Sequence, residues 1–99
     1  MAFDIVLQKE SGLVVGSIGD DRNLLHRLLT PSEATILGGI DWYGDTVFNR
    51  QQMKQFIPAW HELLAGTTNV EEREFLLKVA DFAERCANGI HLYLKFIGD

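Results

Sequence analysis

Hydrophobic and polar residues alternate in two stretches of the chain, residues 3–8 and residues 90–97. Alternation with a period of two predicts a half-buried strand in each stretch. The β-branched run at residues 13–18 predicts another strand, which follows the first after a hairpin-sized loop ending in Gly12 and should pair with it antiparallel. The apolar positions of the two alternating stretches are Phe3, Ile5 and Leu7, then Ile90, Leu92, Leu94 and Phe96.

Between these strands, apolar residues recur every three or four positions, which is typical of amphipathic helices. One long helix is predicted from an N-cap at Asn49 to a stop at Gly66, with Pro58 on its solvent side. Its apolar face consists of Met53, Phe56, Ile57, Trp60, Leu63 and Leu64.

A second long helix follows and ends at Asn88 and Gly89. Either Thr68 with Glu71 or Asn69 with Glu72 provides the capping-box pattern at its start. Its apolar face consists of Phe75, Leu76, Val79, Phe82, Ala83 and Cys86.

A shorter helix is predicted after residues 20–21, where an aspartate can accept the first free backbone N–H groups. Residues 30–33 either end this helix or begin another, and residues 36–49 are expected to form an ordered loop with a short extended piece at 46–48. The fold class is therefore α+β, a single domain over residues 1–99. We expect a three-stranded, mostly antiparallel sheet with one face covered by the two long helices and the shorter helix.

Composition and charge exclude some classes of function. The chain has 99 residues, a net charge of −5 and a pI of about 5.0, and its basic residues are scattered. Nucleic acid is therefore not expected as a ligand, whereas a basic protein partner suits the charge. The one cysteine, Cys86, excludes a disulfide within the chain, and neither a signal peptide nor a membrane span is evident. These features favour a cytoplasmic protein that does not bind membranes.

The segment 41–50 concentrates side chains that contact ligands or proteins. It contains Asp41, Trp42, Tyr43, Asp45 and Arg50. Tryptophan, tyrosine and arginine are enriched in protein interfaces, so this segment is the predicted partner-binding site.

The same segment has a purely structural interpretation and a chemical one. Asp45 and Asn49 can cap turns while Trp42 and Phe48 fill the core. Alternatively, Asp41 and Asp45 can act as a carboxylate pair or hold a cation, although the spacing matches no calcium loop. No cofactor, metal site or catalytic residue is predicted, because the histidines lack zinc spacing and no nucleophile motif occurs.

The chain contains the motif Asp41-x-Tyr43-Gly44-Asp45-Thr46-Val47-Phe48-Asn49-Arg50 and the ending His91-Leu92-Tyr93-Leu94-Lys95-Phe96-Ile97-Gly98-Asp99. With these two motifs it resembles a family of small uncharacterised bacterial proteins. The resemblance implies a bacterial origin and a stand-alone domain. It implies no activity and transfers no functional residue.

Two function classes follow. The first is a non-enzymatic protein-binding module, such as an inhibitor or immunity-type protein that occludes its partner. The second is a small enzyme or ligand-binding domain that uses Asp41 and Asp45, with His61 or His91. Homodimerisation is a further alternative, through the first or the last strand at a sheet edge.

Overall fold

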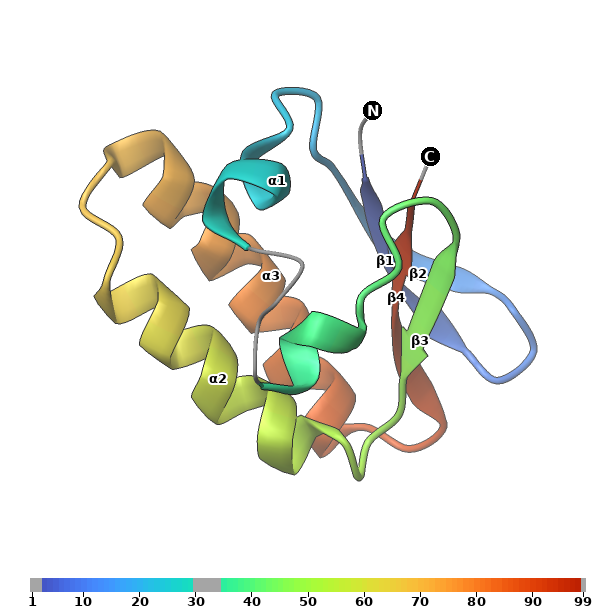
Figure 1. Cartoon of the computed structure of the whole chain (residues 1–99). Coiled ribbons are helices and arrows are strands. Elements are labelled where there is room, and N and C mark those ends of the chain that lie inside the picture. Colours follow the sequence, from blue (N-terminus) through green and yellow to red (C-terminus); the bar gives the residue numbers. More distant parts are fainter. Residues whose placement is uncertain (1–2, 30–34, 99) are drawn as a thin grey trace.

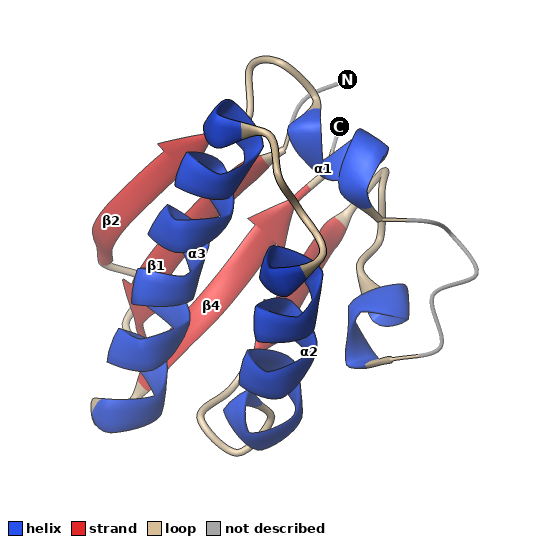
Figure 2. Ribbon diagram, turned by 90° about the vertical axis from the view of Figure 1, so that its left-hand side faces the viewer, coloured by secondary structure: helices blue, strands red, loops and turns tan. Residues whose placement is uncertain are grey.

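The computed structural model describes residues 3–29 and 35–98. These residues form a four-stranded antiparallel sheet with helices on one face (Figures 1 and 2). The strands follow the spatial order β2-β1-β4-β3. Their bounds are Asp4–Lys9 for β1, Val14–Gly19 for β2, Asp45–Phe48 for β3 and Leu92–Ile97 for β4. The α+β class predicted from the sequence is confirmed, with one strand more than the expected three.

The two central strands come from opposite ends of the sequence. β1 and β4 pair antiparallel from Asp4 opposite Ile97 to Lys9 opposite Leu92, so the start of β1 and the end of β4 lie at the same end of the sheet (Figure 1). Burying one such aliphatic or aromatic side chain stabilises the fold by about 1.5–3 kcal/mol. The helix-facing side chains at the centre of this pair are fully buried: Ile5, Leu7, Leu94 and Phe96.

Two long helices cover this face of the sheet. α2 (Met53–Ala65) and α3 (Val70–Asn88) lie side by side in front of the strands in Figure 2. The buried indole of Trp60 joins the layers, because its ring lies 6.2 Å from that of Phe96 and its Nε1–H donates a 2.9 Å hydrogen bond to the Leu76 carbonyl. The apolar faces predicted for both helices therefore meet the sheet and each other.

The predicted cap forms at α3 but not at α2. The N-cap of α2 is Gln52, which makes no side-chain cap hydrogen bond, rather than the predicted Asn49. The Asn49 side chain accepts the Gln52 N–H at 2.9 Å, and the Gln52 side chain accepts the Asn49 N–H at 2.8 Å, so this pair closes the turn that precedes α2. At α3, Asn69 rather than its neighbour acts as the N-cap, since its Oδ1 accepts the Glu72 N–H at 3.0 Å. Pro58 lies inside α2 and faces solvent, as its place in the pattern predicts.

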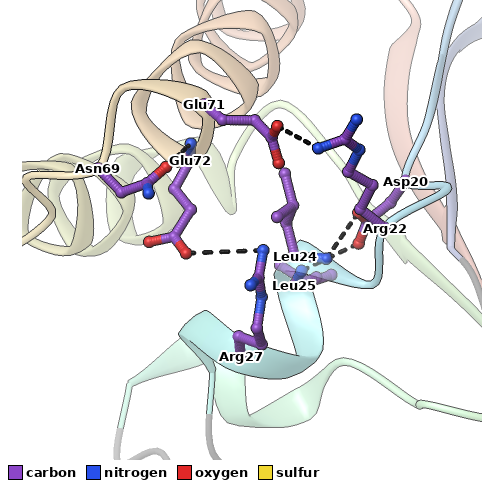
Figure 3. A network of polar contacts seen from close by, with 8 residues as sticks. All are labelled: Asp20, Arg22, Leu24, Leu25, Arg27, Asn69, Glu71 and Glu72. Carbon is purple, nitrogen blue, oxygen red and sulfur yellow. Dashed lines mark hydrogen bonds and ion pairs between the residues drawn. The ribbon is translucent and has the colours of Figure 1, made fainter.

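The short helix α1 (Leu24–Leu28) depends on a buried aspartate. Asp20 is 2% exposed, and its two carboxylate oxygens accept the first two N–H groups of α1 at 2.8 and 2.9 Å (Figure 3). An ion pair of 3.7 Å between Arg27 and Glu72 links α1 to the start of α3. The predicted helix end or new helix at residues 30–33 lies outside the described residues.

Two details of the predicted sheet are wrong. Residues 36–49 are not only a loop, because they contain a 3-10 helix, η1 (Ile36–Gly39), and the strand β3, which pairs with β4. The extended piece expected at 46–48 is part of β3. Ile90 does not join β4: it is 75% exposed, and the positive φ of His91 (56°) turns the chain into the strand only after it.

The predicted sheet edges are also wrong. The first and last strands of the chain, β1 and β4, are the two central strands, whereas β2 and β3 lie at the edges. The local hairpin between β1 and β2 is readable from the sequence. The long-range pairing of β1 with β4 is not.

The end of β4 fixes the loop that precedes β3. The Gly98 N–H donates a 2.7 Å hydrogen bond to the Gly44 carbonyl. A Cβ atom at Gly98 would lie 2.6 Å from the Trp42 carbonyl oxygen and 2.7 Å from that of Asp41. Both contacts are with backbone, so only glycine allows the two segments to approach this closely.

Substitution Gly98→Ala should therefore destabilise the protein by about 1–3 kcal/mol, because the backbone must move to admit the methyl group. Gly39→Ala is the matched control, since a Cβ atom there meets nothing within 4 Å. Urea denaturation measures both variants, and equal stabilities would contradict this account of the Gly98 contact.

Candidate functional site around strand β3

The loop at residues 41–44 is held in one conformation by hydrogen bonds. The Asp41 N–H donates to Thr46 Oγ1 at 2.7 Å, and Asp41 Oδ1 accepts the Tyr43 N–H at 2.9 Å, which is an Asx turn. With the Gly98 contact, these bonds connect the loop to β3 and β4. The Asp41 carboxylate therefore has a structural partner within its own turn.

The two aromatic residues of the loop have different environments. Trp42 is half-buried and packs against the core: its ring lies edge-on to His26 at 4.0 Å and to Phe3 at 6.3 Å. Tyr43 is 73% exposed. Of the two predicted anchors, Tyr43 is thus the residue that presents its ring to solvent.

Asp45 forms an ion pair with the neighbouring strand. Its Oδ2 lies 3.4 Å from Lys95 Nζ, and the Asp45 side chain is 54% exposed. Asp45 does not cap a turn, as one interpretation of the sequence proposed, because it is the first residue of β3. The hollows described in this structure lie along α2, α3, β2 and the turn after α3, and neither Asp41 nor Asp45 lines one of them.

Arg50 lies apart from the other four predicted site residues. Residues 41–44 precede β3 and Arg50 follows it, so they are at opposite ends of the strand (Figure 1). Arg50 Nε donates to the Ala87 carbonyl at 3.2 Å, near the C-terminal end of α3. There Arg50 borders an open hollow of about 640 Å³ between α2 and α3, whose apolar lining includes Ile57 and Pro58.

The histidines are spread over the molecule. His61 lies 3.9 Å from Glu84 and His91 lies 3.3 Å from Glu10, and both pairs are exposed. Neither histidine lies in the loop that carries the two aspartates. Within residues 3–29 and 35–98, no group of three or more histidine, cysteine or acidic side chains is placed to hold a metal ion.

Cys86 is buried on the sheet-facing side of α3. Its thiol donates a 3.3 Å hydrogen bond to the Leu92 carbonyl. Burial raises the pKa of the Cys86 thiol above its ordinary value of 9.0, and a backbone hydrogen bond from β4 offsets this in part. A buried thiol of raised pKa stays protonated and is a poor nucleophile.

The edge formed by β2 is a candidate surface that the sequence pattern does not single out. Three consecutive apolar side chains are exposed there: Leu13 (59%), directly before β2, and Val14 (49%) and Val15 (38%) at its start. The available signal was the absence of any charged residue from position 11 to position 19. Such an uncharged run is equally typical of an ordinary hairpin strand.

Comparisons with known protein families, with curated proteins and with solved structures found no match for this chain. None of the helices among the described residues is both long enough and apolar enough to cross a membrane.

Alanine substitutions of Trp42 and Tyr43 should have different effects on stability, because one ring packs against the core and the other is exposed. Trp42→Ala should lower the free energy of unfolding by about 2 kcal/mol, because its half-buried ring packs on His26 and Phe3. Tyr43→Ala should change stability by less than about 0.5 kcal/mol, as is usual for exposed positions. Thermal unfolding checks both values, and an unchanged Tm for Trp42→Ala would show that the indole makes no stabilising contact.

The thiol of Cys86 should react with a disulfide reagent only when the protein opens. At pH 8 the native protein should react far more slowly than the urea-unfolded chain, because the folded thiol is buried and protonated. As the pH rises past 9.0, the unfolded chain loses its thiol proton more readily than the folded chain, so stability should fall there. Rapid native labelling, or a Cys86→Ala variant with the same decline in stability, would contradict this.

Proposed function

We propose that this chain is a non-enzymatic protein-binding domain that uses the loop before β3 as a contact surface. The observation that carries the proposal is an exposed Tyr43 on a loop fixed by hydrogen bonds on both sides. A rigid loop loses little conformational entropy on binding, and tyrosine contributes a large contact area with few rotatable bonds.

The neighbouring side chains extend this surface. Val47 is 46% exposed on the sheet face opposite the helices, and the exposed carboxylates of Asp41 and Asp45 flank Tyr43 in sequence. An aromatic and aliphatic centre with an acidic rim suits a protein partner with a basic surface. The net charge of −5 would further speed the encounter with such a partner.

The alternative, an enzyme or ligand-binding domain built on Asp41 and Asp45, has less support. Asp41 closes an Asx turn and Asp45 pairs with Lys95, so each carboxylate already has a structural partner. An inhibitor-type role, in which the domain covers a basic partner, is the form of binding that the acidic charge favours. The reducing cytoplasm remains the predicted setting, and the reduced, buried Cys86 is compatible with it.

Site-specific photo-crosslinking in the native host tests the proposal. A photoreactive amino acid at position 43 should capture a discrete protein, whereas the same group at the exposed Gln55 of α2 should not. With that partner purified, Tyr43→Ala should weaken binding by roughly tenfold or more, as expected for an aromatic anchor. Identical capture from both positions, or unchanged affinity for the captured protein, would remove the Tyr43 surface from consideration.

A further inference from the structure

Of the two edge strands, β2 is more open than β3 to pairing with a strand of another chain. β3 has four residues and includes Asp45, and short charged strands protect a sheet edge from pairing with other chains. β2 has six residues and contains neither a charge nor a proline. Within the described parts of the chain, β2 is the last strand on its side of the sheet.

The register identifies the backbone groups that β2 directs outward. The Asp20 N–H donates to the Phe3 carbonyl at 2.9 Å, and hydrogen-bonded pairs alternate with non-bonded pairs along an antiparallel ladder. Ile18 opposite Ile5 is therefore the next bonded pair. Ser17 and Gly19 direct their N–H and C=O groups away from β1, toward the open side of the strand.

A hollow lies beside these outward groups. It measures about 670 Å³ and is bounded by residues 17–19 of β2 and by the flank of α3. Leu77, which is 50% exposed, and Phe82 provide its apolar wall. The ring of Phe82 extends beneath Gly16, where a Cβ atom would lie 2.8 Å from it, so the aromatic wall reaches the strand itself.

A second hollow, of about 290 Å³, continues the first toward the start of α3, and the two share Ile18, Gly19 and Lys78. Together they form a groove between β2 and α3, which we name the β2–α3 groove. Five acidic and two basic side chains line it. The acidic residues are Asp20, Asp21, Glu71, Glu74 and Asp81, and the basic ones are Arg22 and Lys78.

Some of these charges already have partners within the fold. Asp20 caps α1, and Glu71 pairs with Arg22 at 2.5 Å (Figure 3). Asp81 lies 3.9 Å from Arg85. Asp21 and Glu74 outnumber Lys78 on the same stretch of the groove, so its net charge is negative. The groove therefore attracts a positively charged ligand.

We infer that the β2–α3 groove binds an extended segment of a partner protein, which adds to β2 as a fifth strand and turns apolar and then basic side chains toward α3. The backbone of the segment pairs with Ser17 and Gly19, and its apolar side chains lie against Leu77 and Phe82. Because every second side chain of a strand points to the same face, a lysine or arginine two residues further along the segment lies in the acidic part of the groove, near Asp21 and Glu74. Strand addition of this kind takes its affinity from main-chain hydrogen bonds and its specificity from alternate side chains.

The charge of the groove favours a basic segment of a partner protein over a second copy of this chain. A copy paired through its own β2 would bring the same acidic groove and a net charge of −5 to the contact. Like charges brought together at an interface oppose binding. The β-bulge between Leu7 and Gln8 also distorts the strand near Val14, which limits regular pairing to residues 16–19.

Titration with the blocked peptide Lys-Thr-Val-Thr-Val-Thr-Lys tests the inference, because its valine and lysine side chains lie on one face of an extended chain. The backbone amide NMR signals of Ser17 and Gly19 should shift, together with those of Leu77 and Phe82. The same peptide with glutamate in place of both lysines should bind at least about tenfold more weakly, because the groove is acidic. A peptide N-methylated at alternate residues should not bind, because it lacks the donors that pair with β2.

Two protein variants sharpen the test. Ser17→Pro removes the outward N–H, which β1 does not use, and should reduce affinity at least about tenfold without unfolding an edge strand. Leu77→Lys, on the exposed side of α3, should also reduce affinity for the peptide at least about tenfold. This variant provides the test if Ser17→Pro does not fold. Val70→Lys is the matched control, because Val70 is 71% exposed on α3 but does not line the groove.

Several results would overturn the inference. They are the absence of binding, equal binding of the N-methylated peptide, and a dimer of the peptide-free protein that Ser17→Pro abolishes. The last result would identify a second copy as the occupant. Tyr43→Ala should leave binding of the peptide unchanged. The result for the β2–α3 groove therefore does not depend on whether the loop before β3 is a partner-binding surface.

Discussion

The pairing of β1 with β4 is the interaction on which the rest of this structure depends. It joins residues from opposite ends of the sequence and places four fully buried side chains beneath α2 and α3. Ordering so many residues costs conformational entropy, which burial at the centre of the sheet must offset. Because the central positions are taken by β1 and β4, the strands β2 and β3 necessarily become the edges.

Both candidate surfaces follow from this arrangement. The end of β4 contacts the loop before β3 through Gly98, which holds Tyr43 in place at one edge. At the other edge, β2 directs unpaired backbone groups toward a groove along α3. One surface is a projecting side chain on a fixed loop and the other is an open strand, so they suit different kinds of contact.

Local signals in the sequence predicted most elements but not their arrangement. Asn69 is a recognisable cap because a cap requires only residues within one helical turn. Asn49 bonds within the turn before α2 by the same kind of local contact, although the helix itself begins later. β3 has four residues, too few to display alternation, and it forms because β4 lies beside it. Trp42 and Tyr43 are adjacent in sequence, and only the positions of His26 and Phe3 decide which ring is packed.

Residue-resolved hydrogen exchange of the free protein tests the central claim most directly. The amides of β1 and β4 that pair with each other should exchange slowest, near the rate set by global unfolding. In β2, the amide of Ile18 should be protected, while those of Ser17 and Gly19 should exchange rapidly. Rapid exchange throughout β4, or protection of Ser17 and Gly19 equal to that of Ile18, would contradict the strand order from which both surfaces follow.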